Sequence, residues 1–177
     1  AVDQRMLTAS SSVGGTVTAP GIGLFEYDHG TIVHVVATAS PNYHFVGWTG
    51  TAVEPGMVGN PSEASTTVAM DADCTLRANF AIDQRTLIAS STAGGTVLAP
   101  GEGTFQYDHG TQITLHAKAD PLFVFAGWRG SVFSSQNPLT LTMESDYQVR
   151  AQFVSVLDTL YVDDDAPNDP GPDDPNV

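Results

Sequence analysis

The chain has 177 residues, of which 20 are Asp or Glu and 6 are Lys or Arg, so its formal net charge is −14 at pH 7. Nucleic acids and anionic membranes are bound through basic faces, which argues against both as partners and leaves cations such as calcium open. No apolar run reaches membrane-spanning length, so we expect no membrane insertion. A start without Met or a signal peptide indicates a mature chain or a piece of a longer protein.

The sequence is a tandem repeat. Residues 1–50 return without a gap as residues 81–130, and the second copy is shorter only in the loop that follows. This predicts one β domain over residues 1–80, a second over 81–153, and a third segment over 154–177. Duplication of a whole unit is typical of arrays, and no constellation of reactive groups recurs in it, so we predict no enzyme, no catalytic residue and no cofactor.

Short alternating runs bounded by Gly, Pro and Asp predict strands and little or no helix in each copy. In the first copy the expected strands are residues 5–11, 16–19, 24–27, 31–39, 44–48, 66–70 and 75–80. We expect the first two of these to form a hairpin around Gly14, and the last two to form a closing hairpin. The second copy repeats the pattern from residue 85 to 153. The expected fold is mainly β, with two small β-grasp-like or β-sandwich repeats.

The single cysteine, Cys74, excludes a disulfide within the chain. Its counterpart in the second copy is Tyr147, so the thiol belongs to no shared motif. We interpret Cys74 as a small buried hydrophobic residue in a strand, with pairing to a second molecule as the alternative.

Two tryptophans, Trp48 and Trp128, occupy matched positions in Gly-Trp-Xaa-Gly. They could form a platform for sugar rings, but core packing beneath a sheet is the favoured interpretation because flanking glycines let the backbone approach closely. The predicted core aromatic residues are Trp48, Trp128, Phe45, Phe125, Phe80 and Phe153. Better candidates for exposed aromatic residues are Tyr43, Phe25, Phe105, Phe123 and Phe133.

The sequence Tyr-Asp-His-Gly occurs in both copies and contains His29 and His109 next to Asp28 and Asp108. An Asp–His pair could belong to a metal site or act as an acid and base. No further His or Cys stands at ligand spacing, so a tight turn with Asp accepting a backbone N–H is the favoured interpretation.

Residues 154–162 are again strand-like and precede an acidic tract rich in Pro, which we interpret as an extended linker. A neighbouring copy could take this segment as an added strand through Leu157, Leu160, Tyr161 and Val162. The tract also offers weak calcium candidates, although a complete calcium-binding loop sequence is absent. These candidates are Asp163, Asp164, Asp165 and Asp169.

Several motifs recur in a fixed order and resemble the divergent internalin-type B-repeat. In the first copy they are Gly-Gly-Thr-Val at 14–17, Tyr-Asp-His-Gly-Thr at 27–31, Phe-Val-Gly-Trp-Thr-Gly at 45–50, Met-Asp-Ala-Asp at 70–73 and Asn-Phe at 79–80. The second copy carries them at 94–97, 107–111, 125–130, 143–146 and 152–153. The resemblance covers nearly all of residues 1–153. The tail around Leu160 to Pro167 looks like the lead-in to parallel β-helix domains of bacterial exoproteins.

The resemblance implies a β-grasp-like module strung in series in bacterial secreted and surface proteins, here without the helix that some forms carry. The expected function is a non-catalytic structural or adhesion module in an extracellular or cell-surface protein, as stalk, spacer or self-assembling subunit. Its partners would be other repeats, copies of itself, or a cell-surface protein or polysaccharide. Two alternatives stay open: a carbohydrate-binding accessory module of an exoenzyme, and a filament or surface-layer subunit joined through the C-terminal segment.

Overall fold

The computed structural model describes residues 3–54 and 56–157, and it divides the chain between Asp83 and Gln84 into two compact units. The sequence pattern placed this boundary after Phe80, whereas strand β7 (Cys74–Ile82) runs beyond that residue. Every regular element among the described residues is a strand, as the sequence predicted. No described segment is a helix long and apolar enough to cross a membrane.

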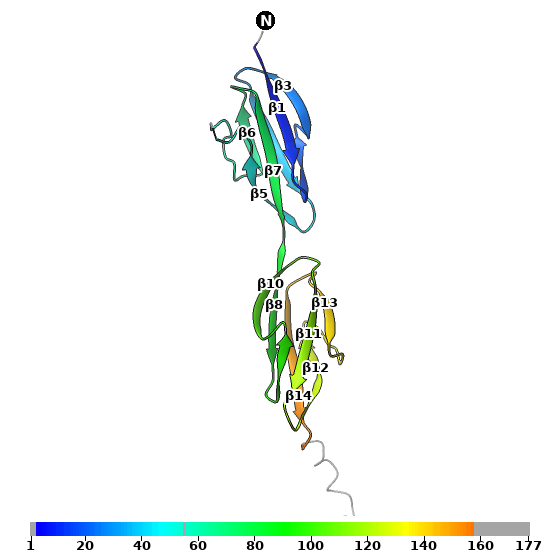
Figure 1. The fold of residues 1–177 in the computed structure, drawn as a ribbon. Coiled ribbons are helices and arrows are strands. Elements are labelled where there is room, and N and C mark those ends of the chain that lie inside the picture. Colours follow the sequence, from blue (N-terminus) through cyan, green and yellow to red (C-terminus); the bar gives the residue numbers. More distant parts are fainter. Residues whose placement is uncertain (1–2, 55, 158–177) are drawn as a thin grey trace, which may run out of the picture. The chain divides into compact units, whose positions relative to one another are not determined.

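Unit 1 contains seven strands in two sheets (Figure 1). One sheet has the order β3-β1-β7-β5 and the other β2-β4-β6. Strands β1 and β7 run parallel, and the remaining pairs are antiparallel. The strands are β1 (Gln4–Ser11), β2 (Gly15–Ala19), β3 (Gly23–Asp28), β4 (Ile32–Ala39), β5 (Tyr43–Thr49), β6 (Ser65–Ala69) and β7 (Cys74–Ile82).

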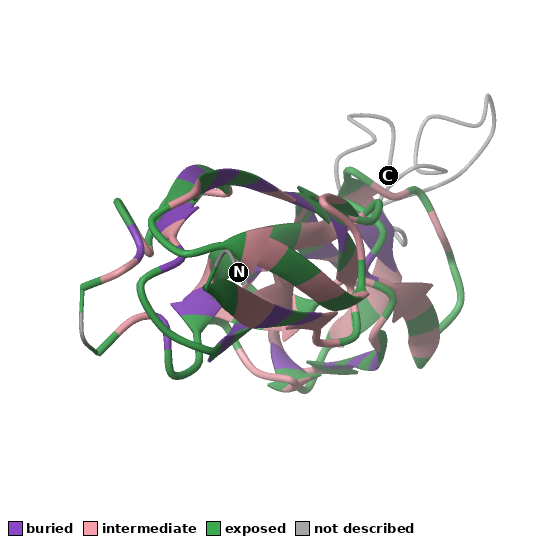
Figure 2. Ribbon diagram, turned by 90° about the horizontal axis from the view of Figure 1, so that it is seen from above, coloured by how far each residue is buried: buried purple, intermediate pink, exposed green. Residues whose placement is uncertain are grey.

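The core of unit 1 lies between its two sheets. Leu7 and Leu76 come from one sheet and Val35 and Val68 from the other; all four are fully buried and belong to one cluster. Buried and exposed residues alternate along these strands, so each sheet turns one face inward and one toward solvent (Figure 2). This arrangement is a β-sandwich.

Unit 2 repeats this architecture with sheet orders β10-β8-β14-β12 and β13-β11-β9. Its core cluster likewise combines both sheets, for example Leu87 and Val149 with Leu115. The strands are β8 (Gln84–Ser91), β9 (Gly95–Ala99), β10 (Gly103–Asp108), β11 (Gln112–Ala119), β12 (Phe123–Gly130), β13 (Leu139–Thr142) and β14 (Tyr147–Ser155).

Both predicted hairpins are wrong. Strand β1 pairs with β3 and β7, whereas β2 pairs with β4 in the other sheet. In the same way β6 pairs with β4, while β7 lies between β1 and β5. The short turns around Gly14 and Asp71 therefore carry the chain across the core from one sheet to the other. Crossing lets two successive amphipathic strands bury their apolar faces against each other.

The segment expected to form a strand over residues 154–162 begins inside β14, which ends at Ser155, and Val156 and Leu157 form a turn. Leu157 is 55% exposed. The other residues proposed for an added strand, and those proposed for calcium, lie outside the described residues: Leu160, Tyr161, Val162, Asp163, Asp164, Asp165 and Asp169.

Candidate functional site

The two tryptophans lie inside the cores. Trp48 is 3% exposed and Trp128 is fully buried. Each indole N–H donates to a backbone carbonyl of the following loop, at 2.9 Å to Glu63 and 3.0 Å to Gln136. With both faces packed and the N–H satisfied, neither side chain offers a surface on which a sugar ring could stack.

The other predicted core aromatic residues surround these tryptophans. Ring centroids of Phe45 and Phe125 each lie 5.5 Å from the neighbouring tryptophan. They also meet Phe80 and Phe153 edge-on, at 5.8 and 5.9 Å. Phe153 is 7% exposed, and the other three are partly buried against the core.

The Gly-Gly pairs make room for aromatic rings. A Cβ on Gly15 would collide with the ring of Phe80, and one on Gly95 would lie 2.5 Å from the ring of Phe153. Gly14 has a φ of +97° and lies against the Tyr43 ring. Each pair thus provides a left-handed turn and a close approach that a side chain would block.

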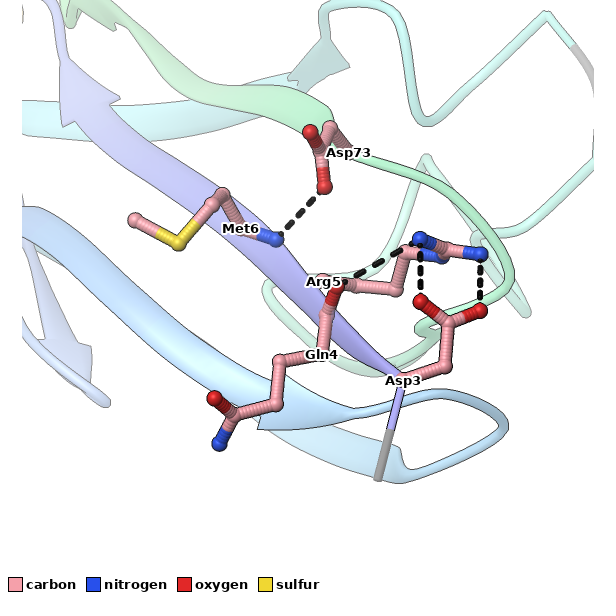
Figure 3. A network of polar contacts seen from close by, with 5 residues as sticks. All are labelled: Asp3, Gln4, Arg5, Met6 and Asp73. Carbon is pink, nitrogen blue, oxygen red and sulfur yellow. Dashed lines mark hydrogen bonds and ion pairs between the residues drawn. The ribbon is translucent and has the colours of Figure 1, made fainter. Parts of the chain in front are cut away.

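The aspartate at the end of each Met-Xaa-Xaa-Asp sequence forms a hydrogen bond between the two central strands of a four-stranded sheet. In unit 1 the Asp73 carboxylate accepts a hydrogen bond from the backbone N–H of Met6 at 2.9 Å (Figure 3). In unit 2 Asp146 accepts the equivalent bond from Thr86 at 2.7 Å. Both bonds lie where the parallel pairing of two strands begins, so the carboxylate replaces a carbonyl that the ladder lacks there. The sequence showed Asp73 and Asp146 as the last residues of a recurring motif, and this recurrence was the available signal for the bond.

Beside this contact, the Arg5 guanidinium forms two hydrogen bonds with the Asp3 carboxylate, at 3.0 and 2.5 Å (Figure 3). Asp3 is largely exposed, so we assign the pair little stabilisation.

The Tyr-Asp-His-Gly sequences form turns. In unit 1 the backbone carbonyl of Asp28 accepts from the N–H of Thr31 at 3.1 Å, and Gly30 has a φ of +80°. The predicted tight turn is therefore present, and the acceptor is the main-chain carbonyl of Asp28. Among the described residues, no three His, Cys, Asp or Glu side chains are arranged to hold a metal ion.

Glu102 forms a polar cluster that only unit 2 contains, because the matching residue of unit 1 is Ile22. Its carboxylate accepts hydrogen bonds from the Ser91 hydroxyl at 2.6 Å, the Thr96 hydroxyl at 3.2 Å and the Val97 N–H at 3.3 Å. The bond from Ser91, followed by that from Val97, lowers the pKa of Glu102 below its usual range. The cluster joins the ends of β8 and β9, and sequence reasoning missed it because all three donors are ordinary strand residues.

Cys74 is buried at 5% exposure in β7. Burial raises the pKa of its thiol, and the neighbouring Asp73 carboxylate adds to the increase. Both effects disfavour the thiolate, so the side chain is a poor nucleophile and metal ligand in the folded unit.

Of the five aromatic residues proposed for the surface, Phe133 is 78% exposed. The other four are half-buried in strands: Tyr43, Phe25, Phe105 and Phe123.

The same contacts recur in both units at residues that define the repeat. In a comparison with known families, the profile of the divergent InlB B-repeat domain matches residues 5–84 and again residues 85–157. No curated protein matches the chain.

Proposed function

The chain belongs to the divergent InlB B-repeat family as a tandem pair of its domains, and from this we propose that it is a non-catalytic spacer in an extracellular or cell-surface bacterial protein. In this role each unit supplies length and rigidity, and its surface need not carry a reaction. Membership of this family supports both the structural role and the extracellular or surface location that we propose.

One observation carries the proposal: the Trp, Gly-Gly and Met-Xaa-Xaa-Asp residues that the two copies share serve the fold. The repeated Trp, Gly-Gly pair and Asp bury an indole, admit a phenyl ring and cap a strand pair, in both copies. A spacer needs repeated packing and nothing more.

Light scattering of the 177-residue chain on a sizing column, in EDTA and again in millimolar calcium, tests the spacer. A monomer in both conditions is the expected result. Calcium-dependent assembly would overturn the proposal and favour a filament subunit.

Self-assembly is the second candidate because one edge of each sandwich is open. The N–H of Met6 points to Asp73, away from β3, so the pair Met6–Glu26 is not hydrogen-bonded. The peptide groups of Leu24 and Glu26 then face outward from β3, without partners among the described residues. In unit 2 the peptide groups of Thr104 and Gln106 on β10 face outward for the same reason.

On the opposite side of each unit, the variable loop pairs with the edge strand β5 or its counterpart β12. In unit 1 the N–H of Trp48 donates to the carbonyl of Pro61 at 2.8 Å, and the N–H of Gly59 to Thr67 at 3.0 Å. In unit 2 the N–H of Trp128 donates to Ser134 at 2.7 Å. In the four-stranded sheets, an added strand would therefore join β3 or β10 and not β5 or β12.

Lysine substitutions in β3 and β10 test the self-assembly hypothesis. Leu24→Lys together with Thr104→Lys should dissolve any assembly that uses them, because charge on an edge strand blocks further pairing. An assembly that survives both changes would use another surface.

A further inference from the structure

An exposed apolar patch marks the end of unit 2 at which β14 finishes. It consists of Leu122, Val124, Val154 and Leu157, which are 62%, 45%, 42% and 55% exposed. Val124 lies directly opposite Val154 in the β12–β14 pair. Leu122 directly precedes β12, and its backbone carbonyl accepts a hydrogen bond from the N–H of Val156 at 2.9 Å. We call these four residues the C-terminal patch.

The equivalent surface of unit 1 is mostly polar. Asn42, His44, Ala81 and Gln84 occupy the four matching positions. His44 lies opposite Ala81, and Asn42 accepts from the N–H of Asp83 at 2.8 Å, so the backbone arrangement is the same. The His44 Nδ1 also contacts the Asp83 carboxylate at 2.9 Å. Since the fold accepts polar residues here, folding does not require the apolar character of the patch in unit 2.

Leucine is also unfavourable for the backbone conformation at position 122. Its φ is +68°, close to the +64° of Asn42. Asparagine adopts this left-handed region at a lower cost in free energy than leucine. An exposed leucine at a position suited to asparagine indicates that another part of the molecule contacts it.

We propose that the C-terminal patch is covered by residues 158–162 of the same chain, through Leu160, Tyr161 and Val162. This segment begins at the patch, because Leu157 is its neighbour in sequence. At ~3.3 Å per residue, Leu160 stays within about 10 Å of Leu157. The patch carries no charge, whereas residues 163–165 are all Asp, so the apolar match ends where the acidic tract begins.

The inference builds on the proposed spacer role. Docking of this segment fixes the direction in which the chain leaves unit 2, so the acidic tract starts from an anchored point. The corresponding surface in unit 1 has no such role, because there β7 is followed by β8 after the single residue Asp83.

Hydrogen–deuterium exchange on the 177-residue chain tests the inference. Amides of residues 159–162 should exchange about tenfold slower than in an unstructured peptide. The double variant Leu122→Asn/Val124→His, which introduces the residues that unit 1 carries, should remove this protection and leave β8 and β11 unchanged. The matched control is Asn42→Leu/His44→Val, which makes the reverse change in unit 1 and should leave residues 159–162 protected.

Unprotected amides in the wild-type chain, or protection that survives the unit 2 variant, would overturn the inference. Protection that grows with protein concentration would assign the segment to a second copy and also overturn it. Light scattering on the same samples reports the spacer proposal separately, since a monomer with unprotected amides contradicts only the docking.

Discussion

Asp73 and Met6 are 67 residues apart in sequence, yet the carboxylate of one accepts a 2.9 Å hydrogen bond from the backbone N–H of the other. The bond fixes the register between β1 and β7, the parallel pair at the centre of the sheet. It also explains why an aspartate recurs at this point of the repeat, since Asp146 binds Thr86 in the same way.

Replacing Asp73 with Ala should lower the free energy of unfolding of unit 1 by about 1–2 kcal/mol, because the amide of Met6 loses a charged acceptor. Urea denaturation followed by Trp48 fluorescence, in a Trp128→Phe background, would measure the loss. Asp71→Ala is the matched control, as Asp71 is exposed in the same turn. An equal effect of both variants would contradict a specific role for the Asp73 bond.

The sequence predicted the strands to within a few residues and failed on their partners. Alternation along residues 5–11 and 16–19 shows that each strand has one buried face, which holds whether they share a sheet or face each other across the core. A short Gly turn suggested a hairpin, but here the turn crosses between sheets. Pairing depends on residues distant in sequence, such as Asp73 with Met6, which a local pattern does not contain.

The buried tryptophans were predictable because the flanking glycines implied close packing. The Glu102 cluster was not, since a Glu after Pro-Gly in a turn has no local signature, and its donors lie on β8 and β9, which belong to different sheets. Differences between the two copies, such as Glu102 for Ile22, identify features specific to one unit.

Alanine should be tolerated less at Gly95 than at Gly15. The three atoms nearest to a Cβ on Gly15 all belong to the Phe80 ring, whereas those nearest to a Cβ on Gly95 include the backbone carbonyl oxygen of Lys118, at 2.6 Å. A ring can shift at a cost of about 1–3 kcal/mol, but a paired strand cannot. Urea denaturation of the two variants would compare the losses. A larger loss for Gly15→Ala would show that the rings, and not the backbone, limit the space.

Truncating Trp128 to Ala should destabilise unit 2 by about 3–5 kcal/mol, since the side chain is fully buried. Trp128→Phe should cost less because it keeps most of the packing. Calorimetry would measure both, and a polysaccharide pull-down would serve as the second readout. Wild-type binding that disappears in a folded Trp128→Ala variant would contradict the core assignment and favour the carbohydrate-binding alternative.

The Cys74 thiol should react with a disulfide reagent only when unit 1 opens. Its pKa is raised by burial and by Asp73, and its sulfur is covered. At pH 8 we expect labelling ~100-fold slower than in a denatured chain. Asp73→Ala should accelerate labelling for two reasons: it destabilises the fold, and it removes a carboxylate that raises the pKa of the thiol. Fast labelling of the wild-type chain would contradict the buried position.

Acid should weaken unit 2 through Glu102. The pKa of this carboxyl is lowered in the folded unit, so the ionised form stabilises the fold. The contribution is complete above the unfolded pKa of ~4.3 and is lost as the pH falls through the lower folded value. Glu102→Gln should therefore be less stable than wild type at pH 7, and the difference should shrink toward pH 3. Urea denaturation followed by Trp128 fluorescence in a Trp48→Phe background would report this unit alone, and the unit 1 transition should not respond to the variant. A difference of the same size at both pH values would mean that shape, and not charge, is what Ser91 and Val97 recognise in this side chain.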